Sequence, residues 1–265
     1  MKALVSGEWL AEHLSDVRVV DVRWYLDGRS GRAAYREGHI PGAVWLDVDS
    51  ELSGWASPAA GRHPMPRPEQ FAAVLGRVGI AQGTPVVAYD DAGGSIAARL
   101  WWMLRAIGEP AAVLDGGLAG WPGELVTDLP DVEPEYREPR PWPAALFPSA
   151  DAVAGTGAAV YDARTAERYA HGDPNIDPRP GHIPGALSAP WAANLMEDGR
   201  LRPPEELREL YAAAAESGAV AYCGSGVTAC LDLLGMELAG ITNTALYAGS
   251  WSQWAADPSR PIEEC

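Results

Sequence analysis

The sequence predicts an α/β protein made of two tandem domains of one kind, each a mainly parallel sheet flanked by helices. The first observation is a six-residue motif, GHIPGA, which occurs at residues 38–43 and again at residues 181–186. The second is that short apolar runs alternate with helical patterns in both halves, which is typical of parallel strands joined by helices. The third is a proline-rich stretch between the halves. Duplication of one domain explains all three observations.

The repeat extends well beyond the shared motif. The first half contains four segments in this order: VVDVR (19–23), GHIPGA (38–43), VVAYD (86–90) and LDGGLAGW (114–121). The second half contains their counterparts in the same order: VYDAR (160–164), GHIPGA (181–186), VAYC (220–223) and LYAGSWSQW (246–254). Asp90 and Trp121 are 31 positions apart, and so are Cys223 and Trp254. The apolar segments before these residues are predicted to be buried strands.

Six prolines crowd the segment between the halves, residues 128–149. Because proline fixes φ and removes a hydrogen-bond donor, this segment is predicted to be a semi-extended linker. We therefore expect a first domain at residues 1–127 and a second at residues 150–265. Ser6 is expected to cap a first helix. Further helices are expected at Ser95–Ile107, Pro203–Glu216 and Thr228–Leu238.

The charge and composition of the chain exclude several classes of partner and site. The formal net charge is −16, which argues against nucleic acid or an anionic membrane as a partner. No stretch of about 18 apolar residues exists, and Glu8 and Glu12 stand where a secretory leader needs an apolar run. Cys223, Cys230 and Cys265 form neither a disulfide framework nor a C-x-x-C zinc pair. We expect a cytoplasmic protein without a metal or an organic cofactor.

Cys223 stands where a predicted strand ends and a glycine-rich loop leads into a helix near Thr228. Glycines allow the backbone to curl until successive N–H groups point inward as an anion-binding nest. The positive end of the following helix dipole adds to this field. Both effects favour the thiolate of Cys223, which is the nucleophilic form. The alternative is a small buried hydrophobic residue, which is the role we expect for Cys230; Cys265, at the end of the sequence, has no predicted role.

These features together resemble the rhodanese superfamily, and in particular its two-domain 3-mercaptopyruvate sulfurtransferases. The resemblance rests on the loop CGSGVT (223–228), the duplicated GHIPGA, the Asp-x-Arg in each half and the terminal tryptophan motif. It implies two tandem rhodanese-like domains and a persulfide on Cys223. It also implies that four loop residues contact the substrate: Gly224, Gly226, Val227 and Thr228. Thiosulfate-using relatives carry basic residues just after the cysteine, where this chain has Gly224 and Ser225.

The resemblance further implies that two arginines of the second half bind the carboxylate and the keto oxygen of the substrate. They correspond to Arg168 and Arg179. A guanidinium suits this task because its planar fork can hold a carboxylate with two hydrogen bonds. The alternative for both residues is a surface charge or an ion pair with Glu167 or Asp177.

The first half has Asp90 at the position of Cys223. A carboxylate cannot accept sulfane sulfur, so the first domain is expected to be inactive. The resemblance implies a Ser–His–Asp relay that donates a proton or polarises the keto group. Ser225 and His39 correspond to its first two members, and Asp27 is a candidate for the third. The alternative for His39 is structural, because GHIPGA also occurs in the second half and can form a turn into the next strand.

An aspartate and an arginine two positions apart follow the first strand of each half: Asp21 with Arg23, and Asp162 with Arg164. We interpret both as scaffold pairs that tie down a neighbouring loop, and Asp162 as a residue that could also orient the cysteine loop.

The sequence therefore predicts a sulfurtransferase that moves sulfur from 3-mercaptopyruvate through Cys223 to a thiol such as thioredoxin, or to cyanide, and releases pyruvate. A thiosulfate sulfurtransferase with the same fold and a non-catalytic persulfide carrier are the alternatives. A phosphatase or arsenate reductase is disfavoured. A phosphatase loop needs an arginine six residues after the cysteine, and this chain has Ala229 there.

Overall fold

The computed structural model describes residues 1–265. Contacts between Cα atoms divide them into two compact units. The first unit comprises Met1–Gly54, Pro66–Trp142 and Glu197–Leu201; the second comprises Trp55–Met65, Pro143–Met196 and Arg202–Cys265. Most of the proline-rich segment therefore belongs to the first unit, and a short piece of the first half, residues 55–65, belongs to the second.

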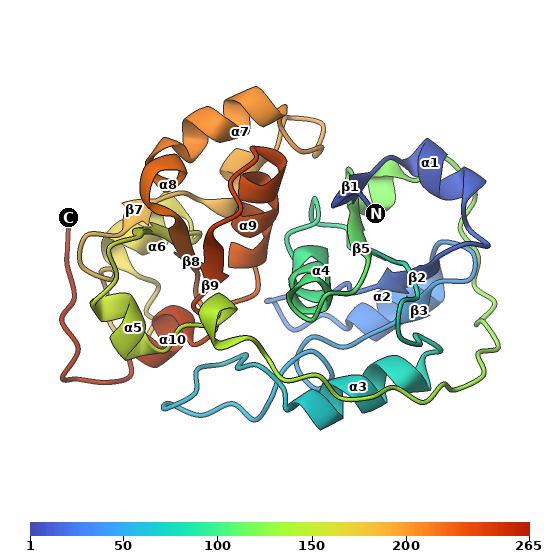
Figure 1. The fold of residues 1–265 in the computed structure, drawn as a ribbon, viewed down its shortest axis with the longest axis horizontal. Helices are drawn as coiled ribbons and strands as arrows, with labels where there is room; N and C mark the ends of the chain where they lie inside the picture. The colour runs from blue at the N-terminus through green and yellow to red at the C-terminus, as the bar shows by residue number, and fades with distance from the viewer. The chain divides into compact units, whose positions relative to one another are not determined.

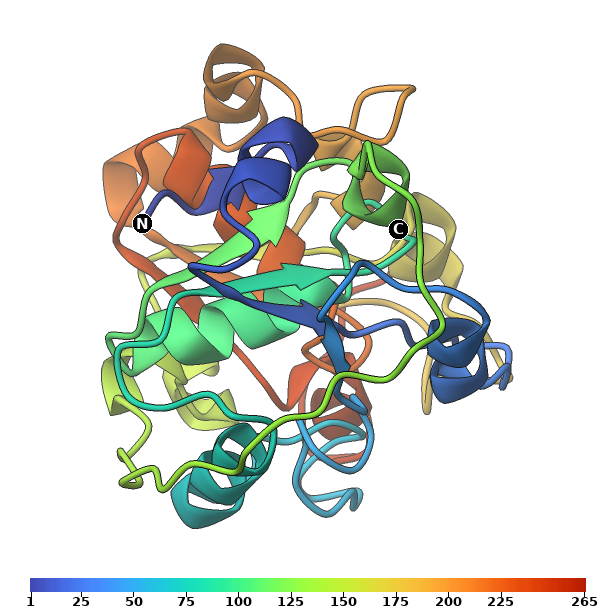
Figure 2. The same ribbon diagram turned by 90° about the vertical axis from the view of Figure 1, so that its right-hand side faces the viewer.

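The first unit is built on a five-stranded parallel sheet with the order β1-β5-β4-β2-β3. Its strands are β1 (Leu4–Val5), β2 (Arg18–Asp21), β3 (Val44–Trp45), β4 (Val86–Tyr89) and β5 (Ala111–Leu114). Figure 2 shows the arrows of β2, β4 and β5 pointing the same way. The central strand β4 is buried along its whole length, which explains its uniformly apolar sequence.

Four α-helices and a short 3-10 helix accompany this sheet. They are α1 (Gly7–Glu12), α2 (Gly31–Glu37), α3 (Pro68–Arg77), α4 (Ala97–Ala106) and η1 (Gly117–Gly120). The predicted cap is confirmed, because the Ser6 side chain accepts a hydrogen bond from the amide of Trp9. Helix α4 packs on β4 and β5. Val87 and Ala112 contribute to a core cluster that also holds Leu10 of α1.

The second unit is built on a four-stranded parallel sheet with the order β7-β6-β8-β9. Its strands are β6 (Ala159–Asp162), β7 (Leu187–Ser188), β8 (Ala219–Tyr222) and β9 (Thr244–Leu246). Its helices are α5 (Ala150–Ala154), α6 (Ala166–His171), α7 (Pro204–Leu210), α8 (Ala212–Ser217), α9 (Ala229–Leu238) and α10 (Ser250–Trp254), with 3-10 helices η2 (Ala144–Leu146) and η3 (Trp191–Asn194). None of the helices in the structure combines the length and apolar character that a membrane crossing requires.

Two layers of helices bury the second sheet. Helix α9 packs on β8 and β9, and α7 packs on α9 in turn (Figure 1). A core cluster joins Val220 and Tyr222 of β8 to Val153 of α5 and to Trp251 and Trp254 of α10. All four residues of β8 are buried. Because alternate residues of a strand point to opposite faces, both faces of β8 are covered, and Cys223, which follows the strand, starts from a fixed position.

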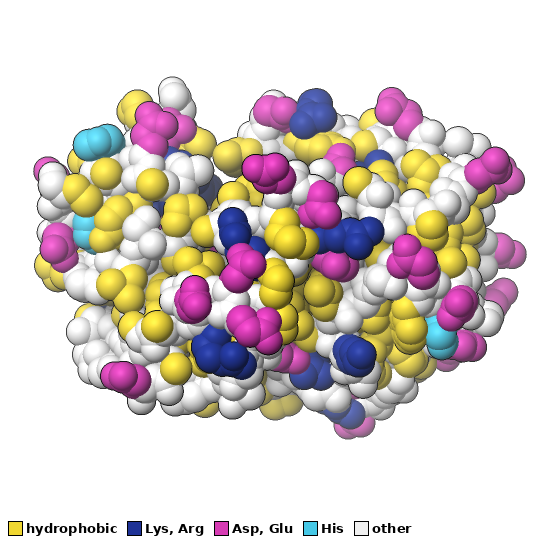
Figure 3. Space-filling model, turned by 90° about the horizontal axis from the view of Figure 1, so that it is seen from above, with side chains coloured by type: hydrophobic (Ala, Val, Ile, Leu, Met, Phe, Trp, Pro, Cys, Tyr) yellow, Lys and Arg dark blue, Asp and Glu magenta, His cyan; other side chains and the backbone are white.

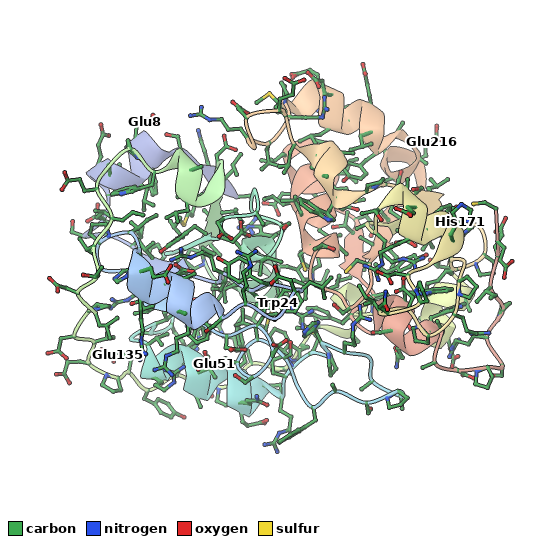
Figure 4. All side chains as sticks on the ribbon, turned by 180° about the vertical axis from the view of Figure 1, so that it is seen from behind. Glu8, Trp24, Glu51, Glu135, His171 and Glu216 are labelled. Atoms are coloured by element: carbon green, nitrogen blue, oxygen red, sulfur yellow. The ribbon has the colours of Figure 1, made fainter.

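The predicted helices differ from the observed ones in one place. Ser95–Ile107 and Thr228–Leu238 contain α4 and α9, but Pro203–Glu216 holds two helices, α7 and α8. They are separated at Tyr211, where φ is −109° and ψ is 30°. The break lets the buried Tyr211 hydroxyl donate to the side chain of Asn194, a contact that helical propensity alone does not reveal. Figure 4 labels Glu216 on α8 and His171 at the end of α6.

The two Asp-x-Arg motifs are scaffold pairs, as predicted. The buried Arg23 guanidinium donates to both carboxylate oxygens of Asp21 and to the carbonyl of Gly38. Arg164 does the same with Asp162 and the carbonyl of Gly181. In each unit the arginine, paired with its aspartate, thus ties the first glycine of the GHIPGA motif to the end of a strand.

Candidate active site

Cys223 begins the loop between β8 and α9, and hydrogen bonds hold its backbone on both sides. Its amide donates to the Ser250 hydroxyl at 3.2 Å, and its carbonyl accepts from the amide of Trp251 at 2.9 Å. The residue is only 2% exposed. Its Sγ atom accepts a hydrogen bond from the amide of Gly226 at 3.1 Å. The sulfur therefore points into the curl of its own loop, as the glycine pattern predicts.

The loop shifts the acid–base balance of the sulfur toward the thiolate. Burial raises the pKa of the Cys223 thiol, but the Thr228 hydroxyl and the amides of Ser225, Ala229 and Gly226 lower it by more, so the pKa lies below its ordinary value. Hydrogen-bond donors stabilise the negative form of an acceptor. A thiolate held this way is a nucleophile.

The equivalent loop of the first unit shows what such a nest can hold. Asp90 follows β4 as Cys223 follows β8, and it is fully buried. One carboxylate oxygen accepts from the amides of Ala92 and Gly94, both at 2.8 Å. The other accepts from Ile96 at 2.7 Å and Ala97 at 2.8 Å.

Burial raises the pKa of the Asp90 carboxyl, and these four amide bonds offset part of the rise. The repeat places four second-unit amides at the corresponding positions: Ser225, Val227, Ala229 and Cys230.

Two arginines lie against the loop residue next to the cysteine. A Cβ atom on Gly224 would lie 2.7 Å from Nη2 of Arg62 and 2.9 Å from Nη2 of Arg168. A side chain at this position would require one of these two guanidinium groups to shift. The second glycine of the loop, Gly226, has a φ of +80°, and a Cβ there would meet the carbonyl of Ala248 at 2.6 Å. The backbone at Gly226 therefore demands glycine, whereas a side chain at Gly224 would have to displace a flexible arginine.

The two arginines differ in how their charge is balanced. Arg168 donates two hydrogen bonds to the nearly buried carboxylate of Asp177, which is one of the two ion pairs that the sequence suggested. Arg62 donates through Nη1 to the carbonyl of Ile176 at 2.7 Å and makes no ion pair. Burial, and next the charge of Arg168, lower the pKa of Arg62, while the charges of Cys223 and Asp177 act against this shift. The Arg62 charge is therefore available to an anion.

Arg179, which was expected beside Arg168, is placed differently. Its guanidinium donates to four backbone carbonyls, at 2.8 Å to Ala255, 2.8 Å to Asp257, 3.3 Å to Arg260 and 3.5 Å to Trp254. These bonds tie the end of α10 to the segment before the second GHIPGA motif. We therefore replace Arg179 by Arg62 in the set of candidate binding residues.

The hydroxyl of Ser225 meets a histidine that the sequence did not single out. Nδ1 of the nearly buried His63 lies 2.8 Å from the Ser225 Oγ atom. His39, the expected partner, is fully buried; its Nδ1 lies 2.9 Å from the carbonyl of Tyr35, and its ring stacks on Tyr35 with 4.1 Å between centroids. His182 repeats this arrangement with Tyr169. The GHIPGA histidines thus occupy matching structural positions.

Asp27, the candidate third member of the relay, is exposed and forms an ion pair with Arg29 at 2.8 Å. Cys230 is fully buried in α9, with its Sγ atom 3.6 Å from the Gly226 carbonyl, as expected for a packing residue. Cys265 is exposed, and none of the three cysteines forms a disulfide.

The segment Trp55–Met65 carries both of the residues that sequence reasoning missed. A tight turn between Ser57 and Gly61 shapes it. Gly61 has a φ of +88°, and a Cβ there would meet the carbonyl of Gly249 at 2.6 Å. The next amide, that of Arg62, donates to the Ser252 hydroxyl at 3.0 Å, and the Ser252 amide donates to the carbonyl of Gly224. The segment is thus bonded to α10, and α10 to the cysteine loop. The only sequence signal is an Arg-His pair between a glycine and a proline.

A scan against family models finds the rhodanese-like domain twice in this chain, at residues 6–124 and 149–257. A Pseudomonas aeruginosa protein named as a probable 3-mercaptopyruvate sulfurtransferase is 41% identical, over 98% of this chain and 97% of its own length. A Mycobacterium tuberculosis protein whose name refers to thiosulfate sulfurtransferase is 36% identical, over 93% of this chain and 90% of its own. Among solved structures, 3-mercaptopyruvate sulfurtransferase from Leishmania major matches with a TM-score of 0.83 and 32% identity, over 96% of this chain and 74% of its own.

Proposed function

Because the chain belongs to the rhodanese-like domain family, with one copy of the domain in each half, we propose that it is a 3-mercaptopyruvate sulfurtransferase that works through a persulfide on Cys223. The observation that carries this proposal is the state of the Cys223 sulfur, which is buried, surrounded by hydrogen-bond donors and lowered in pKa. The first unit has a carboxylate in the same place, so it has no nucleophile for this reaction. We also propose a reducing, cytoplasmic setting, which suits three cysteines that form no disulfide.

In the first half-reaction, the Cys223 thiolate attacks the thiol sulfur of 3-mercaptopyruvate. A bond forms between the two sulfur atoms, and the carbon–sulfur bond of the substrate breaks. The electron pair of that bond stays with the carbon atom and gives the enolate of pyruvate, which takes up one proton to form pyruvate. The outer sulfur remains on Cys223 as a persulfide. The loop around Asp90 indicates which amides would stabilise the persulfide. The amides of Gly94 and Ala97 donate to the Asp90 carboxylate, and Val227 and Cys230 occupy the equivalent positions after Cys223.

The two arginines beside Gly224 account for the recognition of a substrate with one carboxylate. Asp177 already balances the charge of Arg168, whereas Arg62 lacks an ion-pair partner. A guanidinium without an ion-pair partner can bind the single carboxylate of such a substrate. The keto oxygen would lie near the second guanidinium. This arrangement favours 3-mercaptopyruvate as the sulfur donor, because its carboxylate carries a single negative charge, whereas thiosulfate is a compact dianion.

Ser225 and His63 are the proposed proton relay. The Ser225 hydroxyl is two residues from the nucleophile, and His63 can hold it through Nδ1. A relay of this kind would polarise the keto group and supply the proton that the pyruvate enolate takes up. Histidine suits the task because its two ring nitrogens can accept a proton on one side and donate one on the other.

In the second half-reaction, an acceptor thiolate attacks the outer sulfur of the persulfide. The sulfur–sulfur bond breaks, the Cys223 thiolate is restored, and the acceptor leaves with the sulfur. A small protein dithiol such as thioredoxin or the cyanide ion would serve as acceptor. The two steps predict ping-pong kinetics.

Thiosulfate is the second candidate donor, because one relative of nearly equal length is named for it. Comparing kcat/KM for the two donors with one acceptor tests the preference. We expect 3-mercaptopyruvate to be the better donor by at least tenfold. A ratio that favours thiosulfate would assign the chain to the other activity and leave the persulfide on Cys223 intact.

The persulfide itself is tested by the intact mass of the protein after 3-mercaptopyruvate is added. We expect the mass of one extra sulfur atom on the wild type and on Cys265→Ser, the matched exposed control, and no addition on Cys223→Ser. Steady-state turnover separates an enzyme from a carrier. Loading that stops after one equivalent in the presence of excess acceptor would favour the non-catalytic carrier, and an adduct on Cys223→Ser would move the chemistry to another residue.

A further inference from the structure

We propose that the first unit carries a second binding site, for a small phosphate monoester with a flat ring, in a cavity lined by α2, β3 and residues 129–132 of the proline-rich segment. The cavity has a volume of about 430 Å³, which is the size of a small-molecule site. It belongs entirely to the first unit and does not involve the cysteine loop. The proposal is therefore independent of the proposed function.

Positive charge is concentrated in this cavity against the trend of the chain. Three of its twelve lining residues are arginines: Arg32, Arg36 and Arg77. The whole chain has only 20 lysines and arginines and a net charge of −16. Figure 3 shows acidic side chains scattered over the visible face and not gathered in one patch. A local group of arginines in such a protein creates a favourable position for an anion.

Arg32 and Arg36 are the central feature, because neither has a partner. They are four positions apart on α2, so their side chains lie on the same face, one turn apart. Both are exposed, and neither makes a hydrogen bond, an ion pair or an aromatic contact. Two like charges at this spacing weaken a helix by about 0.2–0.5 kcal/mol. An anion that binds both guanidinium groups would remove this repulsion.

The third arginine and the two carboxylates of the cavity do not cancel this charge. Arg77, at the end of α3, forms an ion pair with Glu51, which Figure 4 labels beside α3. A second oxygen of Glu51 accepts from the amide of Asp47 at 2.8 Å, so its charge is already satisfied. Asp131 is exposed on the wall of the cavity. Two unpaired guanidinium groups thus face one solvated carboxylate.

The remaining walls are largely apolar. Trp45 of β3 is half-buried, with its indole N–H donating to the carbonyl of Arg23 at 3.4 Å. Val44 and Val78 are buried beside it, and Leu129 is 58% exposed. An aromatic ring of a ligand could lie against these side chains while its charged group meets the arginines.

The chemistry of the walls determines the class of ligand. Two adjacent guanidinium forks offer more donors than one carboxylate can accept, whereas a phosphate monoester has three terminal oxygens and close to two negative charges. The apolar floor favours a phosphate attached to a ring over free phosphate. Nucleoside monophosphates are the common members of this class.

The test is calorimetric titration of the full chain with three probes: adenosine monophosphate, adenosine and inorganic phosphate. We expect the monophosphate to bind at least tenfold more tightly than either fragment, with an affinity that falls as salt is added. In the variant Arg32→Ala/Arg36→Ala the affinity should fall at least tenfold. Phenyl phosphate, as a fourth probe, distinguishes a general requirement for a ring from recognition of adenine.

The matched control is Arg29→Ala/Arg200→Ala, which removes the same charge from two exposed arginines of the first unit that already pair with Asp27 and Asp198. It should bind the monophosphate as the wild type does. Turnover of 3-mercaptopyruvate by both variants checks that they are folded. The proposal is wrong if the wild type binds no ring phosphate at millimolar concentration, if free phosphate binds as tightly, or if both double variants lose affinity equally.

Discussion

Nδ1 of His63 lies 2.8 Å from the hydroxyl of Ser225, although 162 positions separate the two residues in the sequence. The contact joins the residue two places after the nucleophile to a histidine from the segment between β3 and α3. It gives the second unit a histidine that its own half of the sequence does not supply at this point.

Replacing His63 should therefore slow the chemical step. We expect His63→Gln to lower kcat with 3-mercaptopyruvate by about 10²-fold, the usual contribution of a positioned acid or base, and to alter the pH dependence of kcat. The control is His39→Gln, which loses the stack on Tyr35. That variant should unfold at a lower temperature and keep kcat within about twofold. If the two variants have equal kcat values, His63 is not the histidine that transfers the proton.

The Thr228 hydroxyl is the largest of the favourable contributions to the Cys223 thiolate. Because a lowered thiol pKa places the nucleophilic form at lower pH, the acid limb of kcat/KM should lie below the pKa of an ordinary cysteine. Thr228→Val removes the donor, so the thiol pKa rises and the limb moves to higher pH by about one to two pH units. Thr228→Ser keeps the hydroxyl donor, so the acid limb should lie at the same pH as in the wild type. An unchanged limb in Thr228→Val would mean that the backbone amides alone stabilise the thiolate.

Replacing Arg62 and replacing Arg179 should have different effects on substrate binding. Arg62→Gln removes the unpaired guanidinium beside Gly224, and we expect it to raise KM for 3-mercaptopyruvate at least tenfold, which corresponds to about 1.4 kcal/mol. Arg179→Gln loses bonds to backbone carbonyls and should lower the unfolding temperature with little change in KM. The opposite pattern would restore Arg179 to the binding set.

Asp90 should prove essential to the first unit although it does no chemistry. Asp90→Ala leaves four inward-pointing amides without their acceptor. Each unsatisfied buried donor costs about 1–3 kcal/mol, so the first unit should unfold at a much lower urea concentration. Asp91→Asn, an exposed neighbour, is the control and should change stability by about 0.5 kcal/mol or less. An Asp90→Ala variant as stable as the wild type would show that water replaces the carboxylate.

Features of the sequence that are contiguous proved predictable. The strand, glycine loop and helix around Cys223 follow one another without interruption, so local rules place the sulfur in its nest. The scaffold pairs of Asp21 with Arg23 and Asp162 with Arg164 were predictable for the same reason. In each case the partners are two to six residues apart, and the backbone itself brings them together.

Contacts between distant segments were not predictable. Arg62 and His63 reach the cysteine loop only because Gly61 and Ser252 fix the segment 55–65 to α10, and no periodicity in that segment signals this. Arg179 is close in sequence to Arg168, yet the backbone turns its guanidinium toward carbonyl groups. The break between α7 and α8 likewise follows from the burial of Tyr211, which helix propensity does not register.

The two guanidinium groups packed against Gly224 have a consequence for how this protein can change its donor. A basic side chain directly after the nucleophile would begin where Nη2 of Arg62 and Nη2 of Arg168 already lie. Grafting such a loop into this scaffold would therefore require a guanidinium group to shift and would place three cations close together. We therefore expect an exchange of the loop to be better tolerated when Arg62 is replaced at the same time.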